Sequence, residues 1–354
     1  MRAFENELIT HEKCENIVCS EVCMERYFLG NNSGYGFFNL YEKELKLKDK
    51  VVLLKGGSGT GKSSLLKKIA KKAKSLGLDY ELWFCSGDPQ SLDGVFVKDK
   101  NVAVVDATSP HASGVDIPVV KDVIFDLAQN IDKDKLKGMR EEIEKRIKTK
   151  KQHFMRAYQH LKSALCHLYN QFEIEKQGVE EDKIRAYASS IARDLKPSAS
   201  VNRELFSRAI CPSGESEYFD HLRGKRVIFV SGCAYAKKVF FEEISKLRKG
   251  LTLLLSPLDP KTLEGIICDD VAYVQEVGHF AKDSIADLGV FGEKFDKDDE
   301  IEESNNKVLQ TAFAVERLNK AREAHMSVEN IFVPAMNFDG NEKMLKEIES
   351  FVFE

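Results

Sequence analysis

The chain has 354 residues, of which 43% are hydrophobic and 31% charged, and its 53 basic and 57 acidic residues give a net charge of −4. This composition is that of a folded globular protein of about two domains, so it excludes a largely disordered chain. The small negative charge also argues against a general attraction to nucleic acid or to anionic lipid.

Residues 1–25 are expected to be an N-terminal extension to the folded domains. They lack the apolar core of a signal peptide, and no apolar run in the chain approaches the roughly 18 residues of a membrane span. We therefore expect a cytoplasmic protein, in which the eight cysteines are mostly reduced thiols. One group offers the ligand types of a zinc site, although ordinary thiols are the alternative. Its members are His11, Cys14, Cys19 and Cys23.

The most informative segment begins with Val51–Lys55, a short apolar run that predicts a buried strand. A complete Walker A motif follows it and leads into an amphipathic helix, so the motif has the strand–loop–helix context that it needs. This predicts backbone N–H groups around a phosphate chain, Lys62 at the β- and γ-phosphates, and Ser63 on Mg²⁺. The expected nucleotide-binding residues are Gly56, Gly57, Ser58, Gly59, Thr60, Gly61, Lys62, Ser63 and Ser64.

A second acidic motif is predicted at Asn101–Asp106, an apolar strand that ends in a carboxylate. Asp106 is the candidate Walker B residue, which holds the Mg²⁺ shell. Asp93 and His111 follow neighbouring strands and are candidates to position water, a second substrate or the γ-phosphate. Ordinary turn chemistry is the competing interpretation for both. The alternation of strands and helices predicts an α/β fold with mainly parallel sheets and the nucleotide at the carboxyl ends of the strands.

A long charged stretch, residues 131–172, predicts a helical insertion. Its apolar residues are spaced at alternating threes and fours from Phe154 to Phe172, as in a coiled-coil seam. The lysines at 148–151 suggest a break at which the segment folds back over the nucleotide. Three arginines of this insertion could then contact phosphate, although a solvated basic face is the alternative. These are Arg140, Arg146 and Arg156.

The chain also matches itself at an offset of roughly 170–177 residues, which predicts duplicated P-loop NTPase-like domains over 26–197 and 198–354. The second copy reads Gly232–Val239 where the first has its Walker A motif, and one residue is missing. Ala236 replaces Gly61, Lys238 replaces Ser63, and Gln275 stands opposite Asp106. A Cβ in such a loop obstructs phosphate, so we expect a degenerate second domain.

The arrangement resembles a poorly characterised family of bacterial tandem P-loop ATPases, sometimes described as nucleotide kinase-like. The resemblance covers most of the chain from about Arg26 onward, and it implies nucleotide binding. Members tend to carry a P-loop in both halves, from which this second half departs. The residues that carry the resemblance are Leu54–Gly57, Lys62–Leu65, Ser91–Val95 and Asp106–His111.

The expected activity is therefore binding of ATP with Mg²⁺ and its hydrolysis as a switch, with the second half as a regulatory or packing domain. A nucleotide or small-molecule kinase is the alternative. The chain contains neither an Asn-Lys-x-Asp segment nor a Leu-Ser-Gly-Gly-Gln segment, so ATP is favoured over GTP and an ABC transporter subunit is disfavoured. A protein partner or self-association is possible, but neither nucleic acid nor membrane is expected as a partner.

Overall fold

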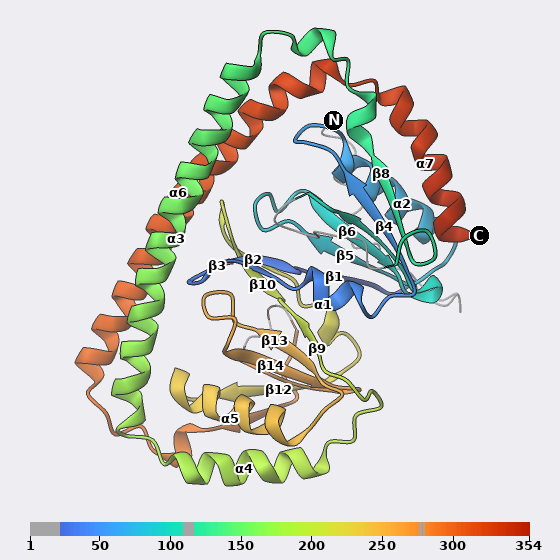
Figure 1. Ribbon diagram of the computed structural model, residues 1–354. Helices are drawn as coiled ribbons and strands as arrows, with labels where there is room; N and C mark the ends of the chain where they lie inside the picture. The colour runs from blue at the N-terminus through green and yellow to red at the C-terminus, as the bar shows by residue number, and fades with distance from the viewer. Residues whose placement is uncertain (1–21, 109–116, 276–277, 279) are drawn as a thin grey trace.

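Two six-stranded sheets form the framework of the protein, as seen in a computed structural model that describes residues 22–108, 117–275, 278 and 280–354 (Figure 1). In both sheets one strand runs antiparallel to its two neighbours and the other five share a direction. The expectation of an α/β protein is therefore met, with sheets that are mixed. The first sheet has the order β8 (Asp122–Asp126), β4 (Lys50–Lys55), β7 (Val102–Asp106), β6 (Leu92–Val97), β5 (Tyr80–Phe84) and β1 (Met24–Tyr27).

The second sheet repeats this order strand for strand. It runs β16 (Ser284–Asp287), β12 (Arg226–Ser231), β15 (Val271–Val274), β14 (Leu263–Cys268), β13 (Thr252–Leu255) and β9 (Arg203–Leu205). Each half also carries one hairpin, made by β2 (Gly30–Ser33) with β3 (Gly36–Asn39) and by β10 (Arg208–Cys211) with β11 (Gly214–Glu217). The two halves thus share one topology, which supports the duplication predicted from the sequence.

The contacts between the halves are reciprocal, as expected around a pseudo-twofold axis. Phe28 and Phe206 exchange backbone hydrogen bonds of 2.9 and 3.1 Å. Arg26 of the first half pairs with Asp220 of the second, while Arg203 of the second half pairs with Glu44 of the first. The aligned arginines therefore make equivalent contacts in opposite directions.

Seven α-helices are present in the described part of the chain. They are α1 (Tyr41–Leu45), α2 (Lys62–Ser75), α3 (Arg140–Lys176), α4 (Glu181–Asp194), α5 (Ala234–Leu247), α6 (Lys297–Phe332) and α7 (Phe338–Phe353). Short 3₁₀ turns occupy Lys98–Lys100, Leu127–Asn130, Asp134–Leu136, Asp220–Leu222, Gly289–Phe291 and Val333–Ala335. None of the helices in this part is both long and apolar enough to cross a membrane.

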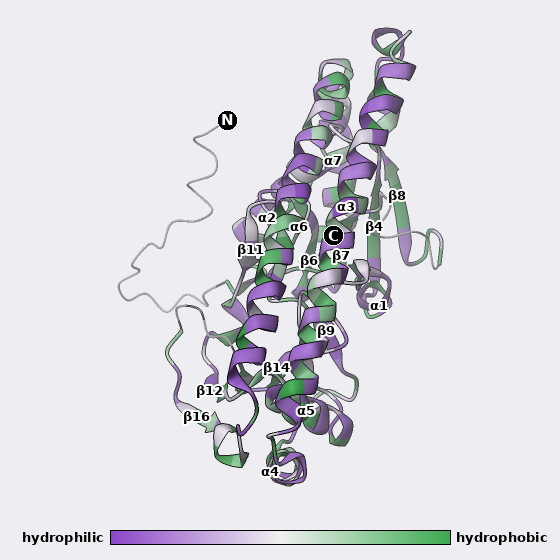
Figure 2. Ribbon diagram, turned by 90° about the vertical axis from the view of Figure 1, so that its left-hand side faces the viewer, coloured by the Kyte–Doolittle hydropathy of each residue, from purple (hydrophilic) through white to green (hydrophobic). Residues whose placement is uncertain are grey.

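The two long helices, α3 and α6, pack side by side (Figures 1 and 2). They are antiparallel, because residues further along α3 contact residues earlier in α6. The contacts are Arg146 with the Ser327 carbonyl, His160 with Gln310, and His167 with Glu303. The predicted break at 148–151 is wrong, since α3 continues through it as one helix of 37 residues. Lysine is a good helix former, and a run of lysines on an exposed face does not end a helix.

The helix that follows each long helix packs against a helix of the other half. Helix α7 closes the chain, yet its Leu345 and Ile348 lie in one apolar cluster with Leu66 and Ile69 of α2. Helix α4 packs instead against α5, where Arg185 pairs with Glu243. We call the first sheet with α1, α2 and α7 the first lobe, and the second sheet with α4 and α5 the second lobe. These lobes differ from the expected ranges 26–197 and 198–354. Helix α3 leads from the first half to α4 in the second lobe, and α6 leads from the second half to α7 in the first lobe.

Candidate functional site

The candidate site begins at the glycine loop, residues 56–61, which connects β4 to α2. Three of its glycines have positive φ angles, 137° at Gly56, 75° at Gly59 and 88° at Gly61. Side chains of L-residues rarely adopt these angles, so this turn requires glycine at these positions. Helix α2 begins at Lys62, directly after the loop. The loop and the helix N-terminus together form an arrangement suited to an anion.

Lys62 lies where the sequence predicted it, at the first turn of α2. Its Nζ donates to the carbonyl oxygens of Gly57 at 2.7 Å and Gly56 at 3.2 Å, and it lies 3.6 Å from Oδ2 of Asp106. Asp106 is brought there by register, because β7 runs parallel to β4 and pairs Asp106 with Leu54. Oδ1 of Asp106 accepts the Thr108 N–H at 2.8 Å. The lysine and the carboxylate of the two predicted motifs are therefore neighbours.

Ser63 and Ser64 occupy the next two positions of α2. The Ser63 Oγ accepts the N–H of Leu92 at 3.0 Å, which anchors the helix start to the first residue of β6. This oxygen and the Asp106 carboxylate are hard donors of the kind that Mg²⁺ prefers. Ser64 is exposed. Thr60 holds the loop from within, since its Oγ1 donates to the Gly57 carbonyl at 2.9 Å.

Asp93 lies among buried groups near Tyr41 and Cys85. Burial raises the pKa of Tyr41 and of the Cys85 thiol, and the Asp93 carboxylate raises both further. Tyr41 belongs to the apolar cluster between the lobes, whereas Leu92, the preceding residue, belongs to the cluster with α2. This environment favours a packing role for Asp93 over the catalytic role that the sequence suggested.

Two other predicted sites lie outside the described residues. The first is His111, and the second is the candidate metal group, of which His11, Cys14 and Cys19 lie outside the described residues. Cys23 is described, and its backbone N–H donates to Asp79 at 2.7 Å. Within the described ranges no cluster of three or more His, Cys, Asp or Glu side chains could hold a metal ion.

The sequence did not predict that the second half of the chain contributes to this site. Asn341 of α7 is buried and donates to the Thr60 carbonyl at 2.9 Å. The Nδ1 of His325, on α6, lies 3.4 Å from Ser58 Oγ. The Gly59 backbone lies against Glu329, so closely that a Cβ on this glycine would be 3.1 Å from the Glu329 carbonyl oxygen. No motif marks these residues, because their proximity arises only from the crossing of α6 into the first lobe.

Both long helices bring basic side chains to the first lobe. Lys150 of α3 lies with its Nζ 3.3 Å from Nδ1 of His325. Arg322 of α6 pairs at 3.0 Å with Asp88, which follows β5. The three arginines predicted to contact phosphate are placed differently. Arg140 pairs with Glu144 in solvent, Arg146 pairs with Glu142, and Arg156 is exposed.

The corresponding loop of the second half is much shorter. Only Gly232 and Cys233 separate β12 from α5, because Ala234–Ala236 already form the first helical turn. The start of this helix is covered by Glu175 of α3, whose Oε2 accepts the Tyr235 N–H at 2.6 Å. Burial raises the pKa of Glu175. A loop of two residues cannot surround a phosphate chain, which agrees with the expected degeneracy.

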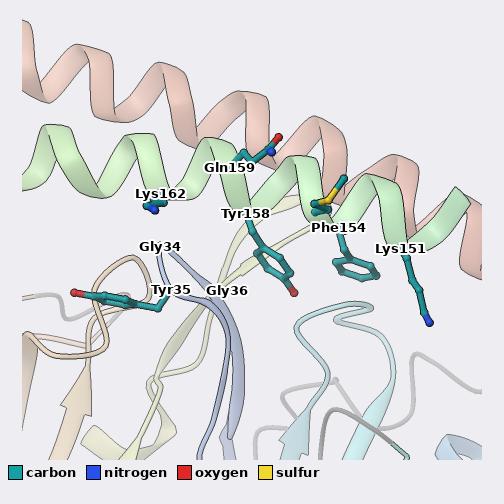
Figure 3. Close-up of a pocket in the computed structure, with 9 residues that line it drawn as sticks. Gly34, Tyr35, Gly36, Lys151, Phe154, Tyr158, Gln159 and Lys162 are labelled. Atoms are coloured by element: carbon teal, nitrogen blue, oxygen red, sulfur yellow. The ribbon is translucent and has the colours of Figure 1, made fainter. Parts of the chain in front are cut away.

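A separate groove of about 670 Å³ runs between α3 and the β2–β3 hairpin (Figure 3). Phe154 and Tyr158 project from the same side of α3, and the Tyr158 hydroxyl donates to Asn32 at 3.1 Å. Lys151 and Lys162 also line the groove. None of its lining residues belongs to the glycine loop, so it is distinct from the candidate site.

Comparisons of this chain with protein-family models, with curated proteins and with solved structures found no match.

Proposed function

We propose that the glycine loop binds the phosphate chain of ATP with Mg²⁺, and that the protein hydrolyses the nucleotide as a switch. The observation that carries this proposal is the convergence of three left-handed glycines, the N-terminus of α2, Lys62 and Asp106 at one edge of the first sheet. Backbone N–H groups at such a turn favour bound phosphate, and a lysine beside them neutralises its charge.

Ser63 and Asp106 are the residues that would hold Mg²⁺. Both present oxygen donors: Asp106 is the last residue of β7, and Ser63 lies in the first turn of α2, after the glycine loop that follows the neighbouring strand β4. The bound ion would neutralise charge on the phosphates. Lys62 is presently engaged by loop carbonyls, so it is already held at the loop and needs only to exchange these partners for phosphate oxygens.

A phosphotransferase is the second candidate, because α3 brings Lys150 to the glycine loop from outside the first sheet, as a covering element would. Release of inorganic phosphate without any acceptor supports hydrolysis. Turnover that appears only when an acceptor is added supports phosphotransfer.

Calorimetric titration with Mg·ATP tests the binding site. Lys62→Ala should weaken binding at least ~30-fold, which corresponds to roughly 2 kcal/mol for a charge-assisted contact. Lys72→Ala is the matched control, since Lys72 is an exposed lysine of the same helix and should leave affinity unchanged.

Asp106→Asn should keep the fold and lose most Mg²⁺-dependent turnover. One ATP should bind per chain, and unchanged affinity in Lys62→Ala would overturn the proposal.

A further inference from the structure

Lys150 is a cation held near the glycine loop. It is half-buried, and among the described residues it forms no ion pair with a carboxylate. Its nearest polar contact is His325, itself 3.4 Å from Ser58 of the loop. Burial lowers the pKa of Lys150, and the charges of Lys151 and Lys62 lower it further, whereas the charge of Glu329 raises it. An anion between Lys150 and Lys62 would relieve this repulsion.

Glu329 supplies negative charge at the same place. Its carboxylate lies 3.5 Å from Nε2 of His325. The pKa of Glu329 is lowered by its hydrogen bond with His325, and also by the backbone N–H of Gly59 and the charge of Lys62. The Glu329 carboxylate is therefore stabilised electrostatically by the Gly59 N–H and by Lys62, the groups that are expected to face phosphate, and the backbones of Gly59 and Glu329 lie against each other. Glutamate and phosphate oxygens are both anionic acceptors, so the two would compete for these groups.

The second half shows the same arrangement in a closed form. There Glu175 of α3 lies against the start of α5, held by the N–H of Tyr235 and by Gln171. The side chain of Glu329 is 38% exposed, whereas the Glu175 residue is only 1% exposed. Each long helix thus brings a glutamate to the loop of the opposite lobe, but only the one at the glycine loop is accessible enough to be replaced.

We propose that Lys150 binds the terminal phosphate of ATP, and that Glu329 occupies this position in the nucleotide-free protein. His325 is a positioning residue, since it contacts both of these side chains and the loop. This inference rests on the proposed function and deepens it, because it gives the site a means to distinguish a nucleoside triphosphate from a diphosphate. The groups that make the distinction come from α3 and α6, outside the Walker motifs.

The test compares the dissociation constants of Mg·ATP and Mg·ADP by calorimetry. Lys150→Met keeps the aliphatic stem and removes the charge. This variant should raise the dissociation constant of Mg·ATP ~10-fold or more, as expected for a lost charge-assisted contact. The dissociation constant of Mg·ADP should change by less than about 3-fold. Glu329→Gln should raise the affinity for Mg·ATP several-fold, because the competing negative charge is gone. Lys148→Met is the matched control, since Lys148 is exposed on the same helix. Thermal unfolding confirms that each variant is folded.

The outcomes separate this inference from the proposed function. An unchanged ratio of ATP to ADP affinity in Lys150→Met, with binding that still requires Lys62, overturns the role of Lys150 and leaves the nucleotide site intact. Weaker ATP binding in Glu329→Gln overturns the competing role of Glu329. Absence of nucleotide binding by the wild-type protein overturns both the inference and the proposed function.

Discussion

Arg203 joins the two lobes through a buried network of charges. From β9 it donates to Glu44 of α1 at 2.7 Å and to Glu81 of β5 at 2.6 Å. Burial alone would raise the pKa of Glu81, but the charge and hydrogen bonds of Arg203 lower it to about 2. The stabilisation from this pairing is thus present above the ordinary pKa of 4.5 and is lost as the pH falls toward 2. At neutral pH, Arg203 compensates two buried carboxylates, together with Lys48 at Glu44 and Lys98 at Glu81.

Replacing Arg203 by alanine should lower the free energy of unfolding by about 3–5 kcal/mol, because it leaves buried charge uncompensated. Urea unfolding at pH 7 measures this loss. Lys43→Ala is the control from the same interface, since Lys43 pairs with Glu204 in a mostly exposed position and should cost less than about 1 kcal/mol. Equal losses in the two variants would show that the Arg203 network does not stabilise the lobe contact.

His221 is a second buried group at this interface, and it should make stability depend on pH. It stacks on Tyr27, and neither ring nitrogen has a hydrogen-bond partner among the described residues. Burial lowers its pKa from 6.5 to about 4. The unfolded chain therefore binds the proton more readily, so its contribution to stability is present above pH 6.5 and is lost as the pH falls toward 4.

Between pH 7 and pH 5 this difference amounts to about 2 kcal/mol. His221→Phe keeps an aromatic ring and cannot titrate. Urea unfolding at pH 7 and pH 5 should show that its free energy of unfolding falls by about 2 kcal/mol less than that of the wild type. Other acidic groups titrate in both proteins and cancel in the comparison. An equal loss of unfolding free energy in the wild type and in His221→Phe would mean that His221 takes up its proton as readily in the folded state as in the unfolded state.

At the scale of single elements, the strand–loop–helix unit of the glycine loop was predictable because its signals are local. The apolar run of β4, the glycines that need positive φ and the periodicity of α2 all lie within 25 consecutive residues. The place of Asp106 near the loop followed from the expectation that an apolar strand ends in this carboxylate and that the nucleotide site lies at the carboxyl ends of the strands. The contributions of Lys150, His325 and Glu329 were not predictable, because they depend on how α3 and α6 cross between the lobes. The break at 148–151 failed because charge density was taken as a signal for a turn.

Within this unit, Gly59 and Gly57 give a matched pair of alanine variants. Gly59 has a φ of 75°, and a Cβ there would be 3.1 Å from both the Glu329 carbonyl oxygen and Val333 Cγ2. Gly59→Ala should lower stability by about 1–2 kcal/mol through the strained backbone, and should also disturb the contact with α6. A Cβ on Gly57 meets no atom within 4 Å, so Gly57→Ala should unfold at the wild-type temperature. Equal melting temperatures in the two variants would contradict the described loop geometry.

At the scale of the whole molecule, the two halves are held together by exchanged helices. Each half contributes a long helix that crosses to the other lobe and a shorter helix that covers its apolar surface. Removal of the second half takes away α7, and with it the cover of α2 in the lobe that carries the glycine loop. The first half therefore does not contain a complete domain, although its sequence alone suggested one. This reciprocal dependence predicts that the halves fold together or not at all.

A chain divided after Ser200 tests this dependence, because Ser200 and Val201 are exposed in the connection between α4 and β9. Fragments 1–200 and 201–354 should aggregate when produced separately, since each exposes an apolar face that the other normally covers. Produced together, they should purify as a one-to-one complex in which the proposed Mg·ATP site is restored.

The matched control is the same pair of fragments with Leu345→Asp and Ile348→Asp, which places charge on the face of α7 that packs against α2. Burying these carboxylates is costly, so the complex should not form. A soluble, monomeric 1–200 fragment with the ATP affinity of the intact chain would contradict the prediction. In that case α7 would be a peripheral addition to the first lobe, and the exchanged helices would not be what holds the nucleotide site in its folded form.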